Sequence, residues 1–285
     1  MKLNVSASLA SVSVALLLVA LKLWALRETS SLAVAASLAD SALDLVASLG
    51  GLAAILYAAK PPDEDHAFGH SSIEDIFALG QAALVTASAG LIGWRAVERL
   101  SGHAPARITD EGAGMTVMAV AIVVTLALVW WQRRVAKRTG SKVVEADSLH
   151  YLADLLPNVA AMAALGASAA FGFEDLDSVV AIAAVILLLV GAWRIGRNAL
   201  DALMDRTAGP EVVERIEEIA RNHPGLAGFH DLKTRTAGNR VFIQIHVEID
   251  GELPLRDAHE IGAALRHAIL DAVPRSEVIV HKDPA

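Results

Sequence analysis

Six long apolar stretches fill the first 205 residues, and they constrain the fold more than any other feature of this sequence. A helix needs about 20 apolar residues to cross a bilayer, and each stretch reaches that length. The chain is 54% hydrophobic and has a mean hydropathy of +0.48, which is unusually apolar for a soluble domain. The sequence therefore predicts an all-α membrane domain with six transmembrane helices. The expected spans are residues 7–26, 31–59, 75–100, 112–132, 144–170 and 178–200.

Residues 206–285 differ from this pattern, because they are rich in Arg, Glu, Asp and His. Two segments have the apolar period of a helix and three have the composition of strands. The predicted domain is a small α+β unit of order αββαβ, ferredoxin-like or metallochaperone-like, that begins after residue 205. So small a core favours dimerisation. The expected helices are 210–222 and 254–273, and the expected strands are 227–236, 241–249 and 277–281.

Basic residues are unevenly distributed between the connections of the membrane domain. The connection after the fourth span is basic, whereas the one after the fifth carries Glu174, Asp175 and Asp177 and no Lys or Arg. Lys and Arg accumulate on the cytoplasmic side of membrane proteins. Six spans then put both termini and the tail on the cytoplasmic side of a cell inner membrane. The basic residues are Arg133, Arg134, Lys137, Arg138 and Lys142.

Composition also limits the partners of the chain. A net charge of −8 without a basic patch argues against nucleic acid. The sequence has no cysteine, so a metal site must use imidazole, carboxylate, carbonyl or water ligands. It also lacks a His-Glu-x-x-His motif or a comparable water-activating pattern, so we do not expect an enzyme.

Two pairs of ionisable residues lie inside the predicted spans. Asp40 and Asp44 are four residues apart in the second span, and His150 and Asp154 have the same spacing in the fifth. Residues four apart share one face of a helix. Ionisable side chains within a membrane are costly and usually functional. If the two faces turn toward each other, three carboxylates and one imidazole converge, a ligand set that suits a tetrahedral divalent ion such as zinc.

The residues alone leave other interpretations open. Polar side chains in membrane helices also form hydrogen bonds between helices, and the same faces could bind a proton or sodium. Two matched pairs without an obvious Lys or Arg partner favour a cation site, and the imidazole favours a transition metal. Asp147 and Glu145 lie nearer the cytoplasmic end and are expected to line an entrance or to be solvated.

The Asp-x3-Asp of the second span and the His-x3-Asp of the fifth resemble the transport signature of the cation diffusion facilitators, in their bacterial zinc and ferrous-iron efflux branch. The resemblance covers nearly the whole chain, through the six spans, the basic fourth connection and the αββαβ tail. It implies a homodimer in a lipid bilayer that exchanges cytoplasmic divalent metal for protons by alternating access. Zinc is the expected cargo, with cadmium and ferrous iron as alternatives.

A second cluster, Asp63, His66 and His70, lies between the second and third spans. An acidic loop with two histidines is, by itself, more often solvated than bound to metal. Here the run Asp-x2-His-x-Phe-Gly-His resembles the loop metal site of the family, which implies that these three residues bind a metal ion.

The sequence departs from the family next to this loop. Many bacterial members carry a Lys after the Gly-His, and it pairs with an Asp after the sixth span to lock the dimer. Ser72 stands here in its place, although Asp205 is present. Asp205 could pair instead with Arg206 or with a neighbour of the kind of Arg95, or the lock could be absent.

The tail carries four histidines and a carboxylate where the family places a dinuclear metal site. Scattered histidines on a soluble domain otherwise need no explanation. The resemblance implies that Asp283 bridges two ions near the dimer interface, so zinc is expected both as cargo and as a structural or regulatory ion. The residues are His230, His246, His259, His281 and Asp283.

A membrane-anchored metal sensor or scaffold that works through its tail is the main alternative to a transporter. It predicts that Asp40, Asp44 and Asp154 are dispensable.

Overall fold

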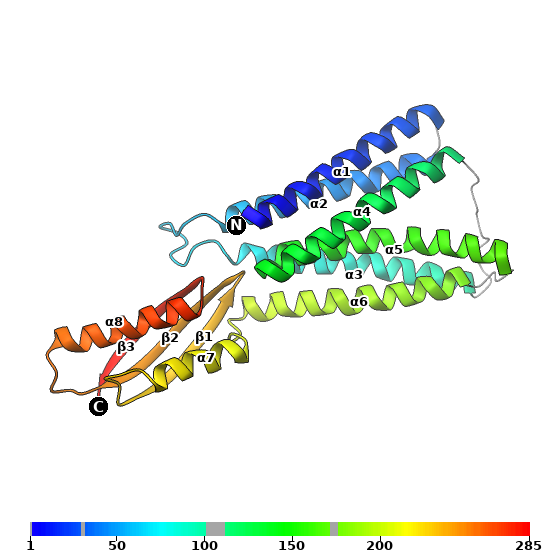
Figure 1. The fold of residues 1–285 in the computed structure, drawn as a ribbon. Coiled ribbons are helices and arrows are strands. Elements are labelled where there is room, and N and C mark those ends of the chain that lie inside the picture. The colour runs from blue at the N-terminus through cyan, green and yellow to red at the C-terminus, as the bar shows by residue number, and fades with distance from the viewer. Residues whose placement is uncertain (1, 30–31, 101–111, 172–175) are drawn as a thin grey trace. The chain divides into compact units, whose positions relative to one another are not determined.

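A computed structural model describes residues 2–29, 32–100, 112–171 and 176–285. The chain divides into two compact units, Met1–Ala199 and Leu200–Ala285. The first unit consists of long helices that pass back and forth, so that the N-terminus and the end of α6 lie at the same end of the bundle (Figure 1). The helical fold predicted for this part of the chain is confirmed. The helices are α1 Lys2–Thr29, α2 Leu32–Ala58, α3 Ile73–Leu100, α4 Gly112–Thr139, α5 Lys142–Phe171 and α6 Leu176–Leu203.

The composition of these helices fits a membrane. Within the described residues, segments of α1, α2, α3 and α6 are long and apolar enough to cross a bilayer. The two other long helices, α4 and α5, do not meet this criterion within the described residues; α4 ends in a basic turn, and α5 contains several carboxylates. The chain is thus a multi-pass membrane protein, and the count of six spans stays a prediction.

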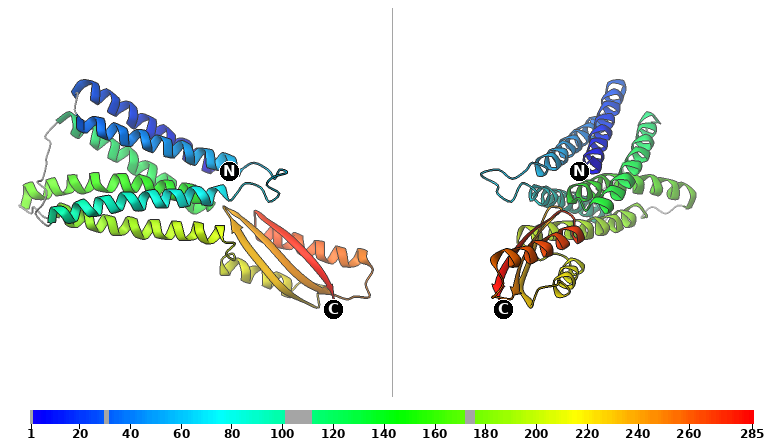
Figure 2. Two further views of the ribbon diagram at one scale, coloured as in Figure 1. Left: turned by 180° about the vertical axis from the view of Figure 1, so that it is seen from behind. Right: turned by 60° about the vertical axis from the view of Figure 1, so that its left-hand side comes forward.

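The helices form two groups within this unit, with α1, α2 and α4 in one and α3, α5 and α6 in the other (Figure 2). Helix α5 joins the groups, because it packs against α4 and α2 as well as α3. Small residues allow close approach on its other side. A Cβ atom at Gly191 of α6 would lie 2.9 Å from Leu149 Cδ1, so the glycine leaves room for the Leu149 side chain between the two helices. Helix α5 is therefore held on several sides.

The second unit is the small α+β domain that the sequence predicts. Every predicted helix and strand is present in the order αββαβ. The last strand is longer than expected, because main-chain pairing with β2 continues past its apolar residues to Pro284. The elements are α7 Pro210–Arg221, β1 Gly228–Ala237, β2 Arg240–Ile249, α8 Leu255–Ala272 and β3 Ser276–Pro284.

Strand β2 is the centre of the sheet, antiparallel to β1 and parallel to β3. Successive side chains of a strand point to opposite faces. Ile243, Ile245 and Val247 are fully buried in the core that includes α7 and α8, whereas His246 and Glu248 lie on the other face. The helices cover one face of the sheet, and polar side chains occupy the other.

Of the alternatives considered for Asp205, pairing with Arg206 is not the one that the structure shows, and the side chain of Arg95 lies outside the described residues. Asp205 lies 3.2 Å from the guanidinium of Arg235 in β1. Arg206 instead forms an ion pair with Asp201. The turn that ends α6 explains the exchange, because the N–H of Arg206 donates to the carbonyl of Asp201 and brings these two residues together.

Replacing Leu265 with Ala should destabilise the tail domain by about 2–5 kcal/mol, because the side chain is fully buried and its loss leaves a cavity. Amide hydrogen exchange of β2 peptides in the full-length protein should then accelerate by about 30-fold or more. Leu255→Ala on the same helix is the control, since Leu255 is 84% exposed. Equal exchange rates in the two variants would contradict the assigned core.

Candidate metal centres

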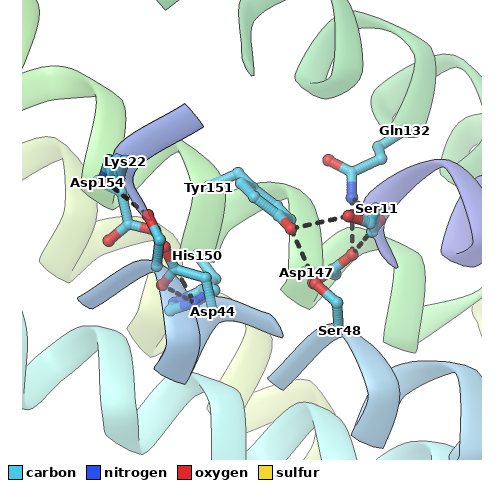
Figure 3. Close-up of polar contacts among 10 residues, drawn as sticks. Ser11, Lys22, Asp44, Ser48, Gln132, Asp147, His150, Tyr151 and Asp154 are labelled. Atoms are coloured by element: carbon cyan, nitrogen blue, oxygen red, sulfur yellow. Dashed lines mark hydrogen bonds and ion pairs between the residues drawn. The ribbon is translucent and has the colours of Figure 1, made fainter. Parts of the chain in front are cut away.

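Asp44, His150 and Asp154 converge inside the helical unit (Figure 3). His150 Nε2 lies 3.3 Å from Asp44 Oδ1 and 3.8 Å from Asp154 Oδ2. Helix α2 supplies Asp44, and α5 supplies the other two residues from one face, as their spacing of four requires. The two predicted polar faces are therefore turned toward each other.

Asp40 lies one helical turn before Asp44 and is exposed. It is not among the residues whose ligand atoms fall within 4.8 Å of one another. Its charge nevertheless acts on Asp154 across the site. The structure thus gathers three predicted ligands closely and leaves the fourth at the edge of the cluster.

The imidazole of His150 is the most buried part of this cluster. The residue is only 7% exposed, and its Nε2 makes no well-formed hydrogen bond among the described residues. The side chain of Asp44 is 15% exposed, and that of Asp154 is 42% exposed. A buried polar atom without a hydrogen bond is costly unless a ligand satisfies it. Carboxylate oxygens and an imidazole nitrogen that converge in this way suit a divalent cation.

A lysine lies near these acids, although local spacing in the sequence does not predict a basic partner there. Lys22 Nζ of α1 donates to Ser41 Oγ of α2 at 2.6 Å. The charges of Asp44, Asp40 and Asp154 all act on this ammonium. Lys22 precedes these residues by at least 18 positions in the chain. Only the packing of α1 against α2 brings it to the site.

The expectation that Asp147 is solvated is wrong, because the residue is 4% exposed. Its Oδ2 accepts hydrogen bonds from Ser11 Oγ at 2.6 Å and Gln132 Nε2 at 2.7 Å (Figure 3). The hydroxyl of Tyr151 donates to the Ser11 carbonyl at 3.1 Å. The network lies one turn from the imidazole and ties α5 to three other helices. Its members are Ser11, Ser48, Gln132, Asp147 and Tyr151.

Asp63 organises the predicted loop cluster between α2 and α3. Its Oδ1 lies 3.1 Å from His66 Nδ1, and its Oδ2 lies 3.2 Å from His70 Nε2. The two rings are 4.5 Å apart, and His70 is buried whereas His66 is exposed. The three residues therefore offer two nitrogens and a carboxylate to one ion.

The same contacts change the acidity of Asp63. Desolvation is the largest single effect on this carboxyl, and it raises the pKa. Hydrogen bonds from the backbone and ring of His66, together with the charges of His70 and His66, outweigh it and lower the pKa below its ordinary value. The carboxylate therefore stays ionised, which a metal ligand requires.

Three histidines form a row across the sheet of the tail domain. The pairing register places His230 opposite His246 and His246 opposite His281. The ring centroids are 5.3 and 4.5 Å apart. Side chains alternate along a strand, and Asp283 follows His281 by two residues. Asp283 therefore points to the same face of the sheet as His281.

Asp283 contacts all three rings. Its Oδ2 lies 3.0 Å from His246 Nδ1 and 3.5 Å from His230 Nε2. Its other oxygen, Oδ1, lies 3.2 Å from His281 Nε2. A carboxylate whose two oxygens face different imidazoles fits a bridge between two ions.

Two further residues mark the limits of this cluster. Glu248 is paired with Asp283 in the sheet, and its Oε1 lies 3.2 Å from His230 Nδ1. Glu248 is not among the ligands predicted from the sequence, although its position two residues after His246 in a strand indicates that both side chains share one face. His259 is exposed on α8 and does not join the cluster, because α8 covers the opposite face of the sheet.

The hydrogen bond from His246 lowers the pKa of Asp283; a desolvation effect opposes it, and the charges of the three histidines add to the lowering. In metal-free protein, the pairing should stabilise the tail above the ordinary carboxyl pKa and be lost as pH falls through the lowered pKa of the folded state.

This linkage can be measured from hydrogen-exchange protection of β3. The difference between wild type and Asp283→Asn should be present at about pH 5 and should close below about pH 4, as the carboxylate takes up a proton. Asp271→Asn controls for the loss of one exposed carboxylate outside the cluster. A difference that widens in acid would contradict the assigned pairing.

Comparison with known proteins agrees with these features. A model of the cation efflux transmembrane domain matches residues 8–204, and a model of the cation efflux protein cytoplasmic domain matches residues 208–285. The cation-efflux pump FieF of Escherichia coli O1:K1 is 38% identical over 278 residues, which cover 98% of this chain and 92% of that protein. FieF of Escherichia coli K12 has the same identity and coverage.

Two of the solved structures that match cover about a quarter of this chain each. A CzrB structure is 34% identical and covers 27% of this chain and 98% of its own, with a TM-score of 0.27. A MamM CTD structure in its nickel form is 28% identical and covers 27% of this chain and 99% of its own, with a TM-score of 0.26. From the two family models and the near full-length identity to FieF, this chain belongs to the cation diffusion facilitator family of cation-efflux transporters.

Proposed function

We propose that this chain exports zinc in exchange for protons through a site formed by Asp40, Asp44, His150 and Asp154. One observation carries the proposal. The buried Nε2 of His150 faces two carboxylates from different helices and has no well-formed hydrogen bond of its own. A cation between these groups would satisfy the imidazole and neutralise the carboxylates at once.

The ligand chemistry supports zinc as the cargo. Zinc accepts nitrogen and oxygen ligands in a tetrahedral shell, whereas an all-oxygen shell suits manganese or magnesium. One imidazole among three carboxylates therefore favours zinc, with cadmium and ferrous iron as the competing cargoes.

Zinc and protons compete for the same atoms. Zinc binds ionised carboxylates and neutral imidazole, so its binding expels protons and weakens as the pH falls. A site open to the more alkaline cytoplasm loads zinc, and the same site open to a more acidic exterior takes up protons and releases it. The rearrangement of helices between the two states is alternating access.

The distribution of charge supports a cytoplasmic position for the tail. Exposed basic residues crowd the last turns of α4, at Arg133, Arg134, Lys137 and Arg138. The positive-inside rule puts this end of the bundle in the cytoplasm. The N-terminus and the end of α6 lie at the same end (Figure 1). Both termini are then cytoplasmic, in a cell inner membrane.

The residues of the loop cluster and of the tail cluster would hold zinc ions that stay bound to the protein and are not transported. Their carboxylates, Asp63 and Asp283, each face two or more imidazoles, which fits the donor set that zinc prefers. Bound zinc in the tail would link its three strands and would favour a homodimer of these small domains, with His230, His246 and His281 as the nitrogen ligands.

Zinc flux into proteoliposomes with an imposed pH gradient tests the proposal. Wild type should move zinc against its gradient when protons flow the other way. Asp44→Ala should lower the rate at least about tenfold, because it removes a charged ligand from the site. Glu214→Ala, which removes an exposed carboxylate of α7, should leave the rate unchanged.

The outcome also separates the rival function. Equal zinc flux in wild type and Asp44→Ala would refute the transport site and favour a membrane-anchored sensor or scaffold that works through the tail. Zinc flux that does not depend on the pH gradient would refute only the exchange with protons and would leave the transport site in place.

His150→Asp should change the preference between metals. An all-carboxylate site is harder and favours manganese over zinc relative to the wild type. We expect the ratio of zinc to manganese transport rates to fall by about tenfold. Competition between the two metals in the same vesicles measures this ratio, and an unchanged ratio would remove His150 from the ligand set.

A further inference from the structure

We propose that Lys22 is a tethered counter-cation of the transport site, whose ammonium limits how tightly the site holds a divalent ion and so allows its release. The inference rests on the transport site proposed above and adds to it a residue that sets affinity.

The position of Lys22 is well defined by contacts. Its Nζ donates to Ser41 Oγ at 2.6 Å, and Ser41 is 1% exposed in α2. Ser41 follows Asp40 directly and precedes Asp44 by three residues, which places the tether between the two acids of this helix. Figure 3 shows Lys22 beside Asp154, on the opposite side of the imidazole from the Tyr151 network.

The energetic setting argues for a role in the site. A lysine in an apolar helix is costly and persists only where it is paired or functional. Lys22 is half-buried in α1, which is apolar enough to span a bilayer. The charges that act on it belong to Asp44, Asp40 and Asp154, which are the carboxylates of the transport site itself. The ammonium is therefore placed to balance them.

The charge balance explains what the lysine does for a divalent cargo. Three ionised carboxylates and one ammonium leave two net negative charges around a neutral imidazole. One divalent ion neutralises this site, whereas the same site without the ammonium keeps one excess negative charge. Such an excess would hold zinc more tightly and would slow its release on either side of the membrane.

The ammonium also remains in place when the metal leaves. The carboxylates then keep one cation nearby, which lowers the cost of the empty site in a medium of low dielectric. A transporter needs an empty state that is not too costly, since it must pass through that state in each cycle.

The rival interpretation is structural: Lys22 ties α1 to α2 through Ser41 and has no effect on the metal beyond that. The two differ in one property, which is charge. Lys22→Gln keeps a hydrogen-bond donor at this position but removes the charge, whereas Lys22→Arg keeps the charge. Arg27→Gln removes an exposed positive charge from the same helix and serves as the control.

The test measures KM and Vmax for zinc in proteoliposomes at one fixed pH for full-length protein. We expect Lys22→Gln to lower KM by about tenfold and to lower Vmax at the same time, because the metal binds more tightly and leaves more slowly. Lys22→Arg should restore both values to within about threefold of wild type, and Arg27→Gln should not change them. Loss of a purely structural tie would raise KM instead.

The results separate the two proposals. An unchanged or higher KM in Lys22→Gln, or an Arg variant that behaves like the Gln variant, would overturn the role of the lysine while zinc transport and its dependence on Asp44 stand. If Lys22→Gln cannot be reconstituted, Ser41→Ala decides the question. It keeps the charge but loosens its tether, so it should lower KM by a smaller factor, and a raised KM would count against the proposal.

Discussion

The need to balance negative charge inside a membrane governs this structure. Carboxylates in a low dielectric repel each other and lose their hydration, so they persist only beside cations or buried donors. Asp44, His150 and Asp154 converge on one small volume, where a single bound cation can balance the charge of both carboxylates. Lys22 lies close enough for its charge to act on the same acids. One oxygen of Asp147, one turn away, instead accepts hydrogen bonds from the neutral donors Ser11 and Gln132. The same helix thus carries one acid bound by neutral donors and a cluster that can accept a cation.

Helix α5 carries both Asp147 and two residues of the cluster, and its neighbours hold it in place. Its polar network fixes it to α1, α2 and α4, while Leu149 packs against the backbone of Gly191 in α6. These contacts flank His150 on both sides in the sequence. The imidazole is therefore held by rigid neighbours, while its partner Asp44 comes from another helix. A movement of α2 against α5 would change the distance between ligands of the same site, which is the kind of change that alternating access requires.

In the tail, a β-sheet brings the acidic side chains next to histidines. Parallel pairing of β2 with β3 and antiparallel pairing with β1 set three histidines in one row, and the alternation of side chains adds Asp283 and Glu248 on the same face. The apolar residues of β2 face the helices, so the polar cluster is left on the uncovered side. The alternation of side chains along the strands therefore produces both the apolar core and the polar cluster of the tail.

Much of this molecule follows from the sequence by itself. Apolar length determined the helices, the period of the apolar residues determined the αββαβ tail, and spacing of four placed each acidic pair on one helical face. These are local properties, because each depends only on residues that are close together in the sequence. Only the tertiary structure decided which distant residues meet. Lys22 reaches Ser41 beside the acids of α2, Ser11 and Gln132 donate to Asp147, and Glu248 joins the tail histidines. His259 lies on the far side of the sheet, and Asp205 pairs with Arg235. Helix packing and strand register set these contacts, and neither can be derived from local spacing, because residues far apart in the chain are brought together by surfaces that no short segment contains.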